Sequence, residues 1–258
     1  MTDLQWRLLR QLFEVPGKRG RKFGPDLRKV VNGMLYVAHT GCQWRCWPKD
    51  YGPRTRVWSQ FRRWSRNGTW ARALAELHQV ARTQLGRKGS LPSTVVMGTR
   101  LARRASHGGA TFHRRGGPYG RTKGAKRAVA VDITGLPLAA RVLAASAQEN
   151  DTTRLILEDM AARGQDERLA TVTLDRGVTA RAARSREKLH RVPVKIVGQD
   201  QGPDRFVPLP FAWPVEVAHV RLLGSRRLAR SSEDTAASAS GWLQVTCVAT
   251  VLQELFSG

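Results

Sequence analysis

The chain has 258 residues, 41% of them hydrophobic, and a formal net charge of +24. That hydrophobic content excludes a disordered polymer, and the length suits one large domain or two ordinary ones. Residues 1–127 hold 28 Lys or Arg against 5 Asp or Glu, a balance of +23, whereas residues 128–258 hold 16 against 15, a balance of +1. Because self-repulsion of this size destabilises a compact state, we expect the basic half to bind an anionic partner, with nucleic acid the leading candidate.

The chain contains an odd number of cysteines, Cys42, Cys46 and Cys247, which favours free thiols in a reducing compartment. Cys42 and Cys46 have a spacing that can begin a zinc site, but no His pair completes a four-ligand set, so a structural role is favoured. The sequence has no apolar run long enough to span a bilayer and no signal-peptide core. We therefore expect a cytoplasmic protein that has no membrane partner.

Apolar periodicity predicts three helices in the basic half. Residues 26–40 have apolar side chains three and four positions apart, with Asp26 as a cap. After a turn at residues 48–53, a second helix is marked by Val57, Phe61 and Trp64. A third runs over about residues 70–85. Tryptophans interleaved with arginines supply enough apolar area for folding, so residues 1–85 are expected to form a basic, helix-turn-helix-like all-α domain.

A linker rich in Gly, Lys and Ser is expected at residues 86–92, followed by a second domain over residues 93–258. Residues 103–127 are Gly- and Arg-rich without periodicity, which predicts a loop. The other predicted elements are a strand at 93–97, a hairpin of strands at 128–133 and 136–142, a helix from 150 to 164, a strand at 169–174, a helix at 180–189, a strand at 192–197 and a helix at 241–255. Strand, hairpin, helix, strand, helix, strand and late helices make up an RNase H-like α/β arrangement, a mixed sheet with flanking helices.

Cleavage of phosphodiesters by two divalent ions needs carboxylates that converge from separate elements of a rigid sheet. In the predicted fold, these carboxylates belong on the first strand, at the end of the strand after the first helix, and on a late helix. Asp175 fits the second position and Glu216 the third. The first strand offers no carboxylate.

Several motifs resemble those of insertion-element transposases. Residues 40–53, 57–64 and 68–70 resemble the N-terminal domain of that large family. The downstream half resembles the family's DDE domain through residues 123–127, 131–137, 147–151 and the Asp175 segment. The resemblance extends from about Leu27 to Leu255 and is to DDE-type transposases of bacterial insertion sequences.

This resemblance implies a transposase that binds the ends of its element and target DNA, both double-stranded, as a homo-oligomer on DNA. In active relatives, two Mg²⁺ ions support strand cleavage and transfer. Asp175 and Glu216 would be the catalytic metal ligands, and the first aspartate belongs at the position of Gly98, which has no ligand atom. The sequence also departs from the family around Glu216, which Pro214 and Val217 flank.

Two alternatives remain open: a catalytically inactive DNA-binding remnant, because of Gly98, and an RNase H-like nuclease that acts on RNA or a hybrid. Individual residues also have structural interpretations. Asp175 could cap the helix that follows, Glu216 could be a solvated helix residue, and Asp132 is expected to be structural. Basic residues are the expected phosphate contacts. The candidates for DNA binding are Arg45, Arg56, Arg62, Arg63, Arg66, Lys123, Lys126, Arg127, Arg226 and Arg227.

Overall fold

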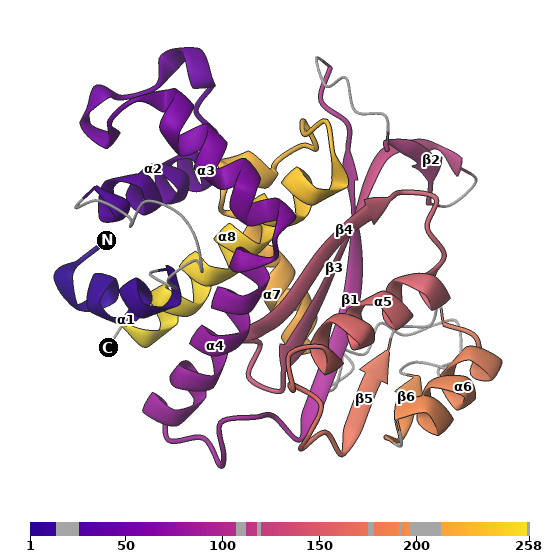
Figure 1. The fold of residues 1–258 in the computed structure, drawn as a ribbon. Helices are drawn as coiled ribbons and strands as arrows, with labels where there is room; N and C mark the ends of the chain where they lie inside the picture. The colour runs from indigo at the N-terminus through magenta and orange to yellow at the C-terminus, as the bar shows by residue number, and fades with distance from the viewer. Residues whose placement is uncertain are drawn as a thin grey trace.

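The computed structural model describes residues 1–13, 26–106, 112–117, 120–174, 178–190, 192–196 and 213–256. A six-stranded mixed sheet lies at the centre (Figure 1). Its strands are β1 (Thr94–Arg103), β2 (Arg114–Gly116), β3 (Thr122–Asp132), β4 (Pro137–Ala144), β5 (Thr171–Leu174) and β6 (Val194–Ile196).

The strands are ordered β4-β3-β1-β5-β6 across the sheet, with β2 paired to the first residues of β3. β3 is antiparallel to both β1 and β4, whereas β5 runs parallel to β1 and β6 runs parallel to β5. A hairpin-linked antiparallel trio followed by two parallel strands is the RNase H-like order. The fold class predicted from the order of elements is therefore confirmed.

Helices cover both faces of the sheet. α5 packs its buried residues Ile156, Leu157 and Met160 on one face, while α4, α7 and α8 lie on the other (Figure 1). Within the described ranges, no helix is both long and apolar enough to cross a membrane. The helices are α1 (Asp3–Phe13), α2 (Leu27–Thr40), α3 (Arg54–Arg66), α4 (Thr69–Gln84), α5 (Glu149–Ala161), α6 (Ala180–His190), α7 (Trp213–Leu223) and α8 (Ala236–Leu255), with short 3₁₀ turns η1 (Trp44–Cys46), η2 (Lys49–Tyr51) and η4 (Arg226–Leu228).

The prediction of a loop over residues 103–127 is wrong in part, because this stretch contains β2 and the first half of β3. Its glycines are needed where backbones approach closely. A Cβ on Gly124 would lie 2.0 Å from the carbonyl oxygen of Ala102, and one on Gly116 would lie 1.9 Å from that of Ala145. Glycine therefore permits strand contacts that the composition of the segment concealed.

The N-terminal helices and the sheet share one hydrophobic core built around α8. Trp242 of α8 stacks on Phe61 of α3 with ring centroids 4.0 Å apart. The ring centroid of Trp44 lies 6.3 Å from that of Trp242. The opposite side of α8 packs on β4. Residues 86–92 connect α4 to β1, and a domain division there stays a prediction. Cys42, Cys46 and Cys247 are free thiols, as the odd number of cysteines predicted.

Candidate functional site

Gly98 lies in the middle of β1, opposite Val129 of β3, and α7 packs directly against it. A Cβ built on Gly98 would lie 2.9 Å from Cγ1 and 3.0 Å from Cγ2 of Val215. These separations are shorter than ordinary van der Waals contact. The valine side chain thus occupies the space into which a side chain at position 98 would project.

His219, one turn further along α7, is buried against the same part of β1. The pKa of His219 is lowered to about 4, mainly by burial and also by the nearby cations of Arg100 and Arg127, while a hydrogen bond to the backbone of Gly98 opposes this shift. The imidazole is therefore neutral at pH 7. Its Nε2 is buried and has no hydrogen-bond partner.

Glu216 follows Val215 in the first turn of α7, and its side chain is exposed. The structure thus brings the Glu216 segment and Gly98 together from distant parts of the sequence. Asp175 lies outside the described residues. β5 ends just before it at Leu174, which lines the same surface hollow as Gly98. The catalytic roles of Asp175 and Glu216 stay predictions.

The described residues do not form a centre for two Mg²⁺ ions. Gly98 contributes no ligand atom, and no group of three His, Cys, Asp or Glu side chains within the described ranges is arranged to hold a metal ion. Hard divalent cations require several converging oxygen ligands. Glu216 follows Val215, whose side chain packs against Gly98, and Glu149 lines the hollow that Gly98 also lines, but within the described ranges they are not part of a group that could hold a metal ion.

Glu149, the first residue of α5, is a polar group in this hollow that sequence reasoning did not select. Its Oε1 accepts hydrogen bonds from Thr99 Oγ1 at 3.0 Å and from Lys126 Nζ at 2.7 Å. Lys126 also donates to the carbonyl oxygen of Ala147. The ammonium of Lys126, a candidate for DNA binding, is therefore engaged within the fold. The motif at residues 147–151 carried the signal for Glu149, but only as part of a family resemblance.

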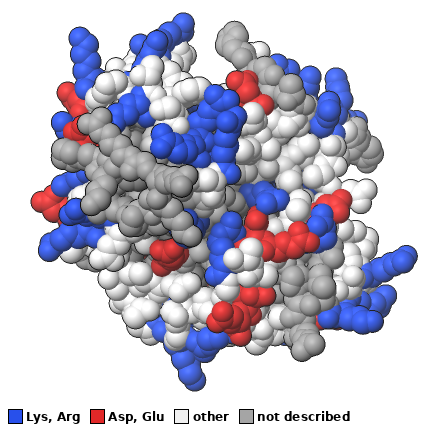
Figure 2. Space-filling view, in the orientation of Figure 1, with Lys and Arg blue, Asp and Glu red and all other residues white. Residues whose placement is uncertain are grey.

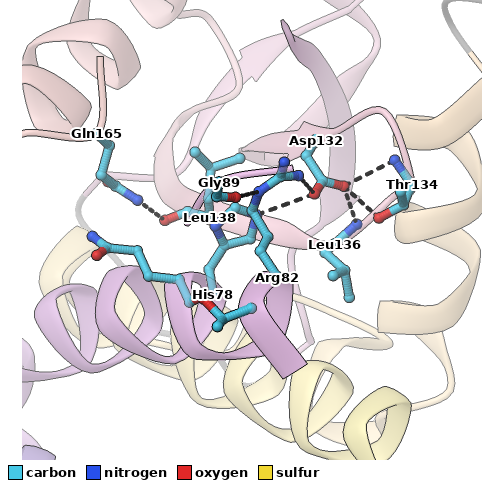
Figure 3. A network of polar contacts seen from close by, with 10 residues as sticks. His78, Arg82, Gly89, Asp132, Thr134, Leu136, Leu138 and Gln165 are labelled. Atoms are coloured by element: carbon cyan, nitrogen blue, oxygen red, sulfur yellow. Dashed lines mark hydrogen bonds and ion pairs between the residues drawn. The ribbon is translucent and has the colours of Figure 1, made fainter. Parts of the chain in front are cut away.

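Asp132 forms a buried polar network between the β3–β4 turn and α4 (Figure 3). Its Oδ2 lies 2.6 Å from Arg82 Nη1 and 3.5 Å from His78 Nε2. Its Oδ1 accepts hydrogen bonds from the backbone and hydroxyl of Thr134 and from the backbone of Leu136. Burial alone raises the pKa of Asp132, but His78 and Thr134 stabilise the carboxylate and hold the pKa well below its usual range. The contacts agree with the structural role expected for Asp132.

The arginine candidates on α3 line its exposed side. Arg63 and Arg66 are exposed, whereas Arg56 forms an ion pair with Asp26 at 2.8 Å. The guanidinium of Arg62 lies 5.2 Å above the ring of Trp58, a side chain that is 44% exposed. Figure 2 shows Lys and Arg side chains gathered over this helical half, in the upper left of the view.

The other candidates for DNA binding differ in exposure. Arg45, Lys123 and Arg226 are exposed. Arg227 forms an ion pair with Glu233 and lies over the ring of Trp242. Arg127 is buried, and burial and Arg100 lower its pKa to about 10. Sequence composition could not distinguish these environments, because arginines contribute equally to net charge whether they are exposed or enclosed.

The sheet order and the flanking helices define an RNase H-like protein with a cationic helical half. Residues 1–74 match the family described as "Putative transposase of IS4/5 family (DUF4096)". The family resemblance seen in the sequence is therefore confirmed over this N-terminal segment.

Two solved structures illustrate the similarity. The piggyBac transposase synaptic complex with hairpin DNA has a TM-score of 0.47 and 9% sequence identity, over 97% of this chain and 71% of that one. The Mos1 strand transfer complex has a TM-score of 0.35 and 12% identity, over 96% of this chain and 82% of the other. No curated protein matches the sequence.

Proposed function

We propose that this chain binds double-stranded DNA as a transposase of the insertion-sequence type, at the terminal repeats of its element, and that it lacks the strand-cleaving activity of active relatives. The observation that supports the loss of cleavage is the packing at Gly98. No ligand atom is present there, and α7 places Val215 where a side chain would project. The two-metal chemistry of active relatives requires several carboxylates in a fixed arrangement, so a missing ligand disables it.

DNA binding is supported by the charge distribution and by the exposed side of α3. The first 127 residues carry the balance of +23, and Arg63 and Arg66 project from a helix whose opposite side is packed into the core. Phosphates of duplex DNA attract such side chains, and each contact releases counterions. Such a protein would work at the nucleoid in the cytoplasm, and pairing of two element ends would require a homo-oligomer.

A salt titration of DNA affinity tests the binding. We expect the affinity of the full chain for a duplex to fall steeply between about 50 and 200 mM salt. Replacing both Arg63 and Arg66 by Gln should reduce the slope of log affinity against log salt by roughly 2, because each phosphate contact contributes about 0.9. Arg154→Gln on α5, where the arginine pairs with Glu158, is the control and should leave the slope unchanged. An equal slope in the wild type and the double variant would contradict the role of α3.

Restoring the missing carboxylate tests the loss of cleavage. We expect no nicking of element ends by the wild-type chain with Mg²⁺ or Mn²⁺. The Cβ of Gly98→Asp alone would lie 2.9 Å from Cγ1 of Val215, so the sharper variant combines Gly98→Asp with Val215→Ala. Activity gained by that variant should disappear when Glu216 is also changed to Gln. Nicking by the wild type, or no gain in the restored variant, would show that Gly98 does not explain the loss.

A further inference from the structure

Arg127 is a buried cation for which the described part of the fold provides no partner. Its side chain is 7% exposed, and the described residues offer it no hydrogen bond or ion pair. The preceding residue shows the contrast, because the equally buried Lys126 is paired with Glu149. Burying a charge is unfavourable unless a counter-charge or hydrogen bonds compensate for it. None of the described residues compensates Arg127, so an anion bound from solution would stabilise it.

Arg127 lines a small, solvent-open hollow between β3, β4, η4 and α8. Arg227 and Arg230 lie in the same wall, and Trp242 contributes to it. Glu233, which pairs with Arg227, is the carboxylate among the lining residues, so three cations against one anion leave a local charge of +2. The Nε of Arg227 is also buried without a partner. Two guanidinium groups thus have unused donors at one small hollow.

The wall of the hollow is held in place by contacts to β1 and its extension. The backbone of Ser231 donates to the carbonyl oxygen of Arg103 at 2.9 Å and accepts from the amide of Ala105 at 2.9 Å. The hydroxyl of Ser231 lies 2.7 Å from Nε2 of the buried His113. These contacts fix the backbone next to Arg230, and a fixed backbone lowers the entropic cost of binding a ligand there.

We propose that this hollow binds a phosphate group through Arg127, Arg227 and Arg230. Guanidinium groups present planar pairs of donors that match phosphate oxygens, and a local charge of +2 suits a charged phosphate better than a neutral ligand. The assignment of this phosphate to a DNA backbone rests on the proposed function. Arg127 is two residues from Val129, which pairs with Gly98.

Thermal unfolding of the full chain tests phosphate binding. At equal ionic strength, inorganic phosphate should raise the Tm of the wild type by about 2 °C or more relative to chloride. Arg127→Met should unfold at a higher temperature than the wild type in chloride, because it removes an unpaired buried charge, and should not respond to phosphate. Arg115→Met removes the same charge from an exposed site in β2 and should respond as the wild type does. Arg230→Gln, an exposed change that preserves packing, should weaken the response.

DNA titrations distinguish the two sources of phosphate. If the DNA backbone supplies the phosphate, Arg127→Met should reduce the slope of log affinity against log salt for duplex binding by roughly 0.9. The slope of Arg115→Met should lie closer to that of the wild type than to that of Arg127→Met. Loss of the phosphate response in Arg127→Met with an unchanged DNA slope would overturn the DNA assignment and favour free phosphate. A phosphate response that persists in both Arg127→Met and Arg230→Gln, or is absent from the wild type, would overturn the site. A response that depends on Arg127 in a chain that binds no DNA would contradict the proposed function and support the site.

Discussion

Replacing Asp132 by Asn would remove the negative charge that faces Arg82 while preserving the size of the side chain. The amide oxygen of Asn can still accept hydrogen bonds from Thr134 and Leu136, which Oδ1 of Asp132 accepts now. The substitution abolishes the ion pair between Asp132 and Arg82, which are 2.6 Å apart; the side chain of Arg82 is 8% exposed. The variant therefore removes the counter-charge of Arg82, together with the charge that faces His78 Nε2 at 3.5 Å.

Breaking a buried ion pair by removing one partner costs about 3–5 kcal/mol. For a chain of this size, each kcal/mol corresponds to roughly 2–4 °C, so the Tm of Asp132→Asn should fall by roughly 6–20 °C. Arg82→Met alone should also destabilise, because Asp132 is then left unpaired. The double variant should lose less than the sum of the two single changes, since both charges have gone.

Urea unfolding at several pH values adds an independent check. Because the pKa of Asp132 is lower in the folded chain than its unfolded value of about 3.9, its contribution is present above that value and is lost as the pH falls below it. Asp132→Asn should therefore show a shallower loss of stability below about pH 4. Three results together would refute the proposed importance of this network: a Tm change below about 2 °C for Asp132→Asn, a double variant whose loss equals the sum of the single losses, and an unchanged loss of stability below about pH 4.

Two further predictions concern the sheet face and its strands. The pKa of His219 is lowered from 6.5 to about 4, so its stabilising contribution is complete above about pH 6.5 and is lost as the pH falls toward 4. Between pH 7 and 4.5 the wild type should lose about 2 kcal/mol of unfolding free energy that His219→Gln does not lose, and urea titrations at both pH values measure the difference. Gly124→Ala should abolish folding or lower the Tm by more than 10 °C, roughly equivalent to 3 kcal/mol or more, because its Cβ would lie 2.0 Å from a backbone oxygen. Gly68→Ala, where the added Cβ meets nothing within 4 Å, should cost only about 1 kcal/mol through its positive φ; equal melting curves for the two variants would contradict this reasoning.

Periodic apolar patterns predicted the helices well. The expected helices at 26–40 and 70–85 correspond to α2 and α4 within a residue or so. Periodicity failed where long-range packing decides the structure: β1 extends to Arg103, well beyond the predicted end at residue 97, because β3 pairs along its whole length. β3 itself begins inside the Gly- and Arg-rich stretch, where local propensity indicates a loop.

The candidate site was predictable only as a set of positions. The family motifs selected Gly98 and Glu216, and the fold places their segments side by side. The motifs could not show that Val215 occupies the space in front of Gly98, because a packing distance depends on the placement of α7. They also could not separate the unpaired Arg127 from Lys126, its neighbour in sequence, since pairing depends on contacts with α5.

The central place of α8 has a consequence for how the molecule is made. This helix follows in the chain every element that it packs against. Until it docks, the aromatic side chains Trp44 and Phe61 of the helical half and part of one face of β4 remain uncovered. During synthesis, the arginine-bearing helix α3 is therefore made long before α8, the helix that packs against its buried side. A message truncated ahead of residue 236 would yield a chain with both of these apolar surfaces exposed, prone to aggregation rather than to competition for DNA.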